Sequence, residues 1–141
     1  MTEPDDFEVP VDGARHSRHY TLEQAMAVRD WVAERVGWVR EAQDRLAALG
    51  PEAIEAIEAL DVDRGGAYPG RAVAAPLVEI GRAVGELDAV EIVLRDVERG
   101  LIDFPAIRDG VEVYLCWLVD DEESIGFWHA PEAGFAGRRP L

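Results

Sequence analysis

The apolar residues of this chain change their spacing near residue 90. From Thr21 to residue 49 they recur every third or fourth position, which is the spacing of one face of an α-helix. A second stripe of this kind covers about 72–90, and the segment PEAIEAIEAL at 51–60 indicates a short helix between the two. Beyond residue 90, apolar residues alternate with other residues, as they do in β-strands. The pattern predicts an α+β domain in which helices precede a sheet.

Local signals refine the helical half. The TLEQ motif at 21–24 is a capping box, which places Thr21 at the N-cap of the first helix. Pro76 indicates that the regular part of the later long helix begins there. Each long helix carries one apolar stripe, so we expect the two to pair antiparallel. The stripes are Ala25, Val28, Val32, Val36, Val39, Leu46 and Leu49, and then Leu77, Ile80, Val84 and Leu87; Trp31, Trp38, Trp117 and Trp128 are expected in the core.

Turn signals divide the second half into a meander. The pair Asp109-Gly110 is typical of a type I′ hairpin turn, and the run DDEE at 120–123 predicts an acidic tight turn. The tail at 130–141 has neither a helix nor a strand period. We therefore expect an antiparallel helical hairpin packed on a small antiparallel β-meander of three to four strands. The expected strands are 91–95, 101–107, 111–119 and 124–129.

The hairpin turn also fixes which residues share a face of the sheet. If Asp109 and Gly110 form the turn, Arg108 lies opposite Val111, and the other pairs follow by counting. The first face should pack on the helices because it is wholly apolar; it holds Ile102, Phe104, Ala106, Val113, Leu115, Trp117 and Trp128. The second face holds Leu101, Asp103, Pro105, Tyr114, Cys116, Leu118, Ile125, Phe127 and His129, with Asp103 opposite Cys116 and His129 opposite Tyr114.

The second face collects the candidate chemistry. Asp103, Cys116 and His129 are candidate catalytic residues, because a thiol nucleophile needs a nearby base and a buried carboxylate needs a partner. His129, Glu132 and Asp103 are candidate ligands of a divalent metal. The alternatives are structural: Asp103 pairs with an arginine such as Arg138, and Cys116 is buried packing. The mixed polarity of this face requires a cover, which is the C-terminal tail, a partner subunit or a ligand.

The motif GFAGRRPL near the end of the sequence gives candidates for anion binding. Arg138 and Arg139 can each hold a carboxylate or phosphate with two hydrogen bonds, and Tyr114 is the third candidate. The alternative is that Phe135 fills a gap while Arg138 neutralises Asp103.

Composition limits the classes of partner. The formal net charge of −15 argues against nucleic acids and anionic membranes, which attract positive surfaces. No apolar run is long enough to span a membrane and no signal peptide is visible, so we expect a cytoplasmic protein. All 14 basic residues are arginine, which fits either a GC-rich genome or a high-salt habitat. The composition of residues 1–18 predicts a disordered arm. His16 and His19, at the end of this arm, are expected to form a solvated basic patch. Residues 19–141 predict one domain, with its helical part at 21–90 and its sheet part at 91–141.

Four motifs carry a family resemblance: TLEQA, ERGLIDFPAIRDGVEVYLCW, IGFWH and GFAGRRPL. Together they resemble an uncharacterised bacterial family known as domain of unknown function 2203, over about 19–141. The resemblance implies no activity. It does imply that the second face has a common purpose, because a shared pattern includes Asp103, Trp117, His129, Gly134, Gly137 and Arg138.

Two functional hypotheses follow. The first is a non-catalytic interaction or assembly module, which forms a homodimer or binds a protein partner through its amphipathic helices and its second face. The second is a small enzyme or a protein that binds a metal or anion at the second face. No set of side chains matches a specific catalytic template, which favours the first hypothesis.

Overall fold

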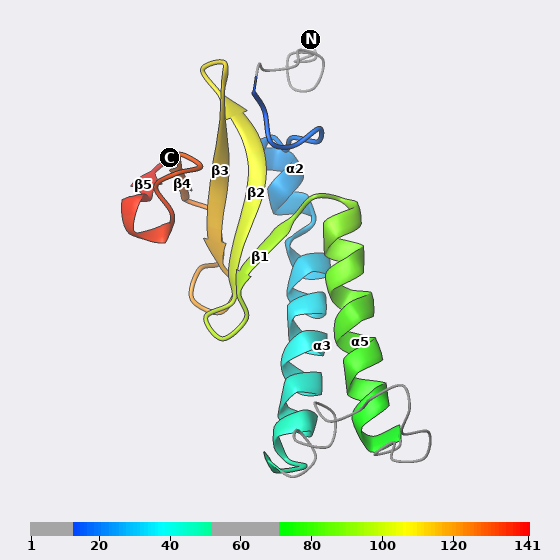
Figure 1. Ribbon diagram of the computed structural model, residues 1–141. Coiled ribbons are helices and arrows are strands. Elements are labelled where there is room, and N and C mark those ends of the chain that lie inside the picture. The colour runs from blue at the N-terminus through cyan, green and yellow to red at the C-terminus, as the bar shows by residue number, and fades with distance from the viewer. Residues whose placement is uncertain (1–12, 52–70) are drawn as a thin grey trace.

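The computed structural model describes residues 13–51 and 71–141 of the chain (Figure 1). The short helix expected at 51–60, the loop after it and residues 1–12 of the expected arm lie outside the described residues, apart from position 51. No helix within the described ranges is long and apolar enough to cross a membrane.

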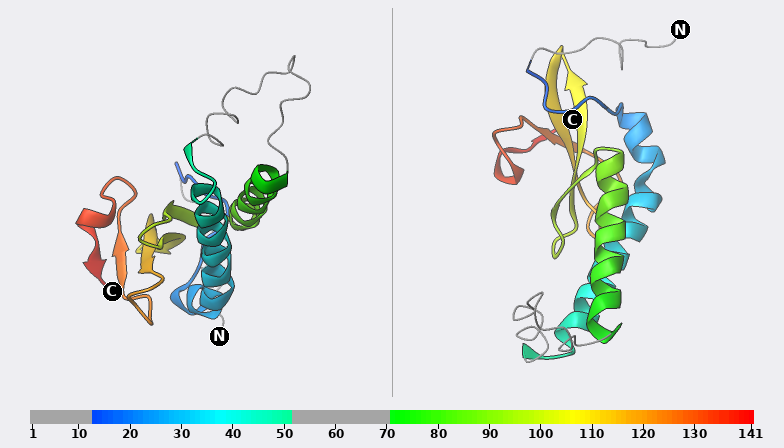
Figure 2. Two further views of the ribbon diagram at one scale, coloured as in Figure 1. Left: turned by 90° about the horizontal axis from the view of Figure 1, so that it is seen from below. Right: turned by 45° about the vertical axis from the view of Figure 1, so that its right-hand side comes forward.

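Two long helices form the expected antiparallel pair. They are α3 (Arg29–Ala47) and α5 (Arg71–Ala89), which lie side by side in both views (Figures 1 and 2). The first expected helix is broken in two, because Val28 leaves helical geometry with φ −104° and ψ 9° and separates α3 from the short α2 (Leu22–Ala27). The capping box at Thr21 is present. Pro76 lies inside α5 rather than at its start, since alanines on either side of Val73 favour helix before the proline.

The inward face of the helical hairpin differs in part from the expected stripes. Val32, Val36 and Leu87 are buried against the sheet, as expected. Leu77, however, is 45% exposed and faces solvent, because α5 turns Val73, Pro76 and Ala83 inward instead. Trp38 is also exposed. Trp31 is half-buried and packs against the core. The guanidinium of Arg35 lies 4.0 Å from the ring centre of Trp31 and 4.6 Å from that of Trp38, so both rings also contact a cation.

The sheet has five antiparallel strands in sequence order, one more than the upper limit of the prediction. The extra strand arises because the tail, which has no strand period, pairs with β4 through two residues. Figure 2 shows the helical hairpin to one side of the strands and the tail on the far side. The strands are β1 (Val93–Asp96), β2 (Leu101–Arg108), β3 (Val111–Leu118), β4 (Phe127–His129) and β5 (Arg139–Pro140).

The register of the central hairpin agrees with the sequence prediction. Arg108 pairs with Val111, and the ladder continues to Leu101 opposite Leu118. Asp109 and Gly110 have φ values of 53° and 80°, which is the left-handed geometry that a type I′ turn requires. Asp103 lies opposite Cys116, and β4 places His129 opposite Tyr114. Both faces of the sheet therefore hold the expected residues, with one exception. Ile125 was expected on the second face, but it precedes β4 and packs in the hydrophobic core, with its backbone N–H 3.4 Å from the sulfur of Met26 in α2.

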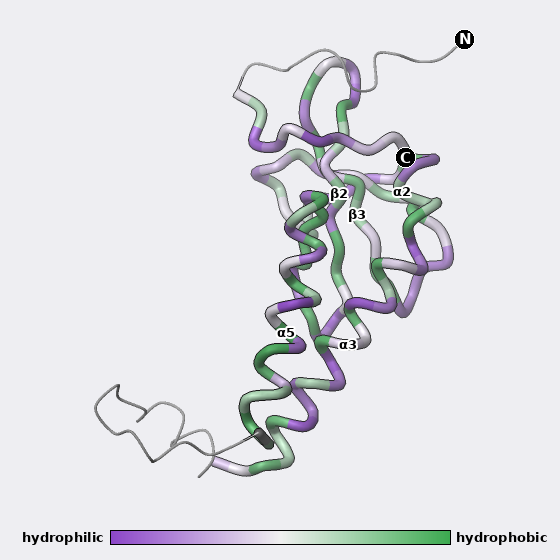
Figure 3. The backbone as a smooth tube through the Cα atoms, turned by 90° about the vertical axis from the view of Figure 1, so that its right-hand side faces the viewer, coloured by the Kyte–Doolittle hydropathy of each residue, from purple (hydrophilic) through white to green (hydrophobic). Residues whose placement is uncertain are grey.

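The first face and the helices form the hydrophobic core. Ile102, Phe104 and Trp117 are buried there against Val32 and Val36. Figure 3 shows hydrophobic and hydrophilic residues interleaved along α3 and α5, as amphipathic helices require, while β2 is largely hydrophobic along its length. The second face is the opposite side of this same ladder.

Candidate functional site

The second face is covered by two segments of the same chain. The first is residues 15–19, called the N-terminal strap here, whose His16 places Nε2 2.8 Å from the hydroxyl of Tyr114. The second is the C-terminal tail, in which the guanidinium of Arg138 lies 3.8 Å from the ring centre of Phe127 and 4.6 Å from that of Phe135. The tail was one of the expected covers. Residues 15–18 of the strap belong to the segment that the sequence predicts to be a disordered arm.

Three candidate residues meet at the centre of this face. Asp103, Cys116 and His129 come from β2, β3 and β4, and their exposed fractions are 1%, 0% and 2%. One carboxylate oxygen, the sulfur and one ring nitrogen all lie within 4.8 Å of one another. Adjacent strands bring these residues together, because the register sets Asp103 directly across from Cys116. His129 lies on the next strand, two residues along from Phe127, which is the residue opposite Cys116.

The hydrogen bonds of His129 define the character of this cluster. Its Nδ1 lies 2.8 Å from the carbonyl oxygen of Ala130, which can only accept, so Nδ1 carries a hydrogen. Its Nε2 lies 3.1 Å from both carboxylate oxygens of Asp103. A bare nitrogen lone pair cannot face a carboxylate at this distance without repulsion. The geometry therefore requires a cation between the two side chains, either a proton or a metal ion.

Asp103 has a second partner, which is not the expected one. Nε of Arg95 donates to its Oδ2 at 2.8 Å, and the same guanidinium lies 4.8 Å from the ring centre of Tyr114. Arg138, the expected partner, instead donates to Glu122 and lies with Nη1 3.6 Å from the sulfur of Cys116. Strand β1 makes the difference, because Val93 pairs with Asp103 and so brings Arg95 alongside it.

The cluster does not have the geometry of a thiol nucleophile with its base. Burial raises the pKa of the Cys116 thiol to about 11, although the hydrogen bond from Arg138 opposes the rise. Both ring nitrogens of His129 already have other partners, Ala130 and Asp103. A neutral thiol that is closed off from solvent and has no free base is a poor nucleophile.

The other candidates lie apart from the cluster. The side chain of Glu132 is 76% exposed, and its nearest cation is Arg15 at 3.9 Å. Tyr114 is buried on the second face, with its ring tilted against that of His129 at 5.5 Å between ring centres. Arg139 is exposed on β5, where its guanidinium lies 5.6 Å from the ring centre of Trp128 on the first face. The expected anion-binding trio of Arg138, Arg139 and Tyr114 is therefore not brought together.

Two carboxylates hold the strap in place, and the sequence analysis missed both. Glu112 accepts the backbone N–H groups of Arg15 and His16, and Nε2 of His19 lies 2.9 Å from it. Burial alone would raise the pKa of Glu112, but these hydrogen bonds outweigh it and leave the pKa below its usual value. The histidines are thus bound rather than solvated, contrary to expectation.

Glu91 supports the same strap from the end of α5. It accepts hydrogen bonds from the backbone and hydroxyl of Ser17, and its Oε1 lies 3.0 Å from Nδ1 of His16. Its backbone has a φ of 60°, which is unusual for a residue with a side chain. The HSRH spacing was the one sequence signal for this network, but nothing local pointed to Glu91 or Glu112.

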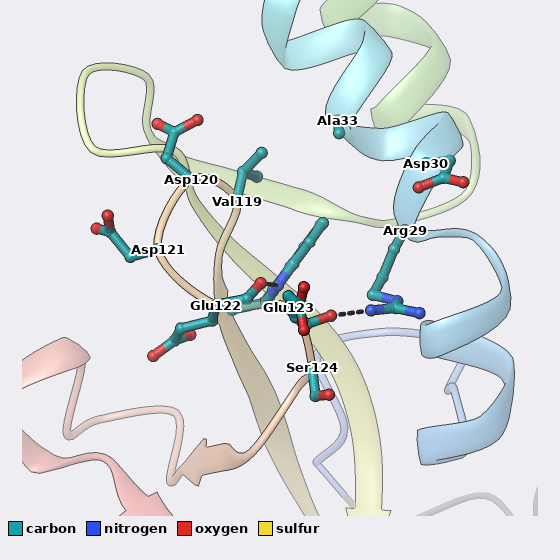
Figure 4. A pocket seen from close by; sticks show the side chains of 10 residues that line it. Arg29, Asp30, Ala33, Val119, Asp120, Asp121, Glu122, Glu123 and Ser124 are labelled. Atoms are coloured by element: carbon teal, nitrogen blue, oxygen red, sulfur yellow. Dashed lines mark hydrogen bonds between the residues drawn. The ribbon is translucent and has the colours of Figure 1, made fainter.

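A pocket of about 600 Å³ lies at a different place, beside the acidic turn after β3 (Figure 4). Arg29 donates to the carbonyl of Glu123 at its rim, and Nε1 of Trp117 donates to the carbonyl of Glu122 at 2.7 Å. These bonds explain the shape of the turn. The pocket contains none of the clustered residues of the second face.

Comparison with known proteins identifies the family. The family model described as an uncharacterized conserved protein, DUF2203, matches residues 18–141. The chain belongs to this family. No curated protein and no solved structure matches the chain. The expected family is thus confirmed, and the match includes the whole described sheet with Asp103, Cys116 and His129.

Proposed function

We propose that this protein binds a divalent transition metal of the zinc class through Asp103, Cys116 and His129. The observation that carries the proposal is the position of Nε2 of His129, 3.1 Å from both oxygens of Asp103, while Nδ1 is bound to a backbone carbonyl. A metal-bound histidine commonly donates its other N–H to such a carbonyl, which fixes the tautomer and aims the free nitrogen at the ion.

The remaining contacts of the cluster support the same proposal. Arg95 hydrogen-bonds Oδ2 of Asp103, and ligating carboxylates are usually oriented by such outer bonds. Arg138 lies 3.6 Å from the sulfur of Cys116, where a guanidinium stabilises a thiolate. One nitrogen, one sulfur and one carboxylate are ligands that Zn²⁺ takes in proteins.

The charges also balance. A divalent ion with a thiolate, a carboxylate and a neutral imidazole is neutral overall, so burial of the complete site costs little electrostatic free energy. Arg138 is itself neutralised by Glu122. Arg95 alone adds a positive charge, and its side chain is 41% exposed, where water solvates it.

The competing reading is a structural ion pair in which a proton, rather than a metal, lies between His129 and Asp103. The two readings predict different ring chemistry. With a metal, Nε2 of His129 carries no hydrogen; with an ion pair, both ring nitrogens do. ¹⁵N NMR of the histidine ring separates them directly.

Titration of the purified, chelator-treated protein with Co²⁺ tests the proposal. We expect one equivalent to bind with a sulfur-to-cobalt charge-transfer band, which Cys116→Ser abolishes. Asp103→Asn and His129→Gln should each weaken binding at least tenfold. The matched control is Glu132→Gln, a carboxylate close in sequence but outside the cluster, and it should bind as the wild type does. Absence of stoichiometric binding, together with a doubly protonated His129 ring, would refute the metal site.

The interaction module expected from the sequence would now rest on the helical hairpin rather than on the second face. The sequence motives for it are the amphipathic helices and the second face, and the strap and the tail of the same chain cover that face. Exposed apolar residues remain on the helical hairpin, among them Trp38, Leu77 and Val78. A homodimer, a protein partner and a cytoplasmic location all stay predictions.

A further inference from the structure

The first face of the sheet continues past the helices at the tip of the β2–β3 hairpin. There it forms a groove of about 520 Å³, lined mainly by apolar groups. Val113 forms part of its floor, Val111 is 58% exposed beside it, and the half-buried ring of Trp128 forms a wall. Val111, Val113 and Trp128 all lie on the first face, so this groove is separate from the proposed metal site on the second face.

Two guanidinium groups flank the same tryptophan in this groove. Arg108 of β2 lies 4.8 Å from the ring centre of Trp128, and Arg139 of β5 lies 5.6 Å from it. Neither forms an ion pair with any carboxylate of the described residues, in contrast to Arg138, which is bound to Glu122. Asp109 is the one carboxylate that the described part of the chain contributes to the lining, against the two guanidinium groups. The described lining is therefore positive overall on a chain whose net charge is −15.

The groove also adjoins an open stretch of sheet edge. Strand β4 pairs with β3 only from Tyr114 to Cys116. At the hairpin end of β3, Val111–Val113 have no strand partner on that side among residues 13–51 and 71–141. Unpaired backbone N–H and C=O groups at such an edge accept an added strand from another chain.

We propose that this groove binds an extended acidic peptide of a partner protein. The peptide backbone pairs along Val111–Val113, and one of its carboxylates lies between Arg108 and Arg139, each of which can donate two hydrogen bonds. An apolar side chain two residues along packs on Trp128, since alternate residues of a strand point to the same face. An open, shallow groove beside a free edge suits an extended chain better than an enclosed small molecule.

The overall negative charge of the chain affects which peptides the groove can bind. Beyond about 8 Å, salt at physiological strength screens the repulsion between the acidic body and an acidic peptide. Close contacts with the two guanidinium groups are screened much less. Binding of an acidic peptide to so acidic a protein must therefore come from the local arrangement of charges rather than from a general attraction.

Fluorescence anisotropy with a labelled peptide of alternating glutamate and valine tests the proposal. The comparison peptide has glutamine in place of glutamate. We expect the glutamate peptide to bind at least tenfold more tightly at 0.15 M salt. The double variant Arg108→Gln/Arg139→Gln should lose that preference. The matched control is Arg45→Gln/Arg82→Gln, which removes two positive charges from the helical hairpin and should retain it. Circular dichroism shows that each variant is folded.

Three outcomes would overturn the proposal. The first is equal binding of the two peptides by the wild type, and the second is an equal loss in the groove variant and the control variant. The third is a concentration-dependent dimer, seen by analytical ultracentrifugation, that dissociates on Arg108→Gln/Arg139→Gln. In that case a second copy of the chain, rather than a partner protein, occupies the groove.

Discussion

The two faces of one sheet are buried in different ways. The first face is apolar and is covered by helices whose own period is visible in the sequence. The second face carries Asp103, Cys116 and His129, and is covered by a strap and a tail that have no period at all. A core of the first kind is held by apolar area and tolerates changes of shape. A core of the second kind depends on a few polar contacts, each of which must be satisfied.

The largest loss of stability is expected from a substitution in the first face. Phe104 is fully buried, with ring centres of Tyr20 and Trp117 at 5.6 Å and 6.4 Å. Phe104→Ala should lower the free energy of unfolding by about 3–5 kcal/mol, through lost transfer energy and a cavity. Urea denaturation followed by tryptophan fluorescence measures this. A loss below about 1 kcal/mol would mean that this face is not the main core.

A smaller effect is expected where the strap is held to the second face. Glu112→Gln removes the charge that accepts from two backbone amides and faces His19, and should cost about 1–2 kcal/mol. Amide hydrogen exchange should show faster exchange at Arg15 and His16, with little change in β2. The contrary result, uniform loss of protection across the sheet, would make the strap part of the main core.

The same strap should respond to pH. Hydrogen bonds from the strap overcome the effect of burial and hold the pKa values of Glu91 and Glu112 below their ordinary value of 4.5. Their contribution to stability is therefore complete above that pH and is lost as the pH falls through the lower, folded-state pKa values. Exchange at the strap should rise in this acidic range before the helices unfold, and Glu112→Gln should weaken the dependence.

The smallest change in stability is expected on the outer side of α5. Leu77 is 45% exposed, so Leu77→Ser should change the free energy of unfolding by less than about 0.5 kcal/mol. The measurement is chemical denaturation at two protein concentrations. A larger, concentration-dependent loss would show that a second copy buries this residue, in agreement with the homodimer expected from the sequence.

The hairpin register could be predicted because its determinants are local. Asp109-Gly110 fixes the turn, and strict alternation from Val111 to Val119 excludes a slip by one residue. Asp103, Cys116 and His129 could then be assigned to one face by counting. The contact between His129 and Asp103 could not be predicted in this way, because two strand spacings, about 10 Å, separate their backbones. In the structure their side chains lean toward each other and meet at 3.1 Å.

The other features could not be predicted, because they depend on contacts between distant residues that leave no periodic pattern in the sequence. Arg95 reaches Asp103 only because β1 pairs with β2, and a bulge lies between Leu94 and Asp96 in that pairing. Glu112 meets His19, a residue 93 positions away. The orientation of α5, which turned Leu77 outward, depends on packing against α3, which a stripe of apolar residues does not fix to within one position.

The strap also has a consequence for the order in which the protein assembles. Its bonds to Glu112 and Tyr114 join residues 96 and 98 positions apart, so residues 15–16 leave the ribosome long before their partners exist. Such distant contacts close late, because the entropy of a long loop must be lost first. The central hairpin is local and can form earlier. A nascent chain would thus expose Asp103 and Cys116 to the cell while synthesis continues, and would seal them only after His129 has joined the sheet.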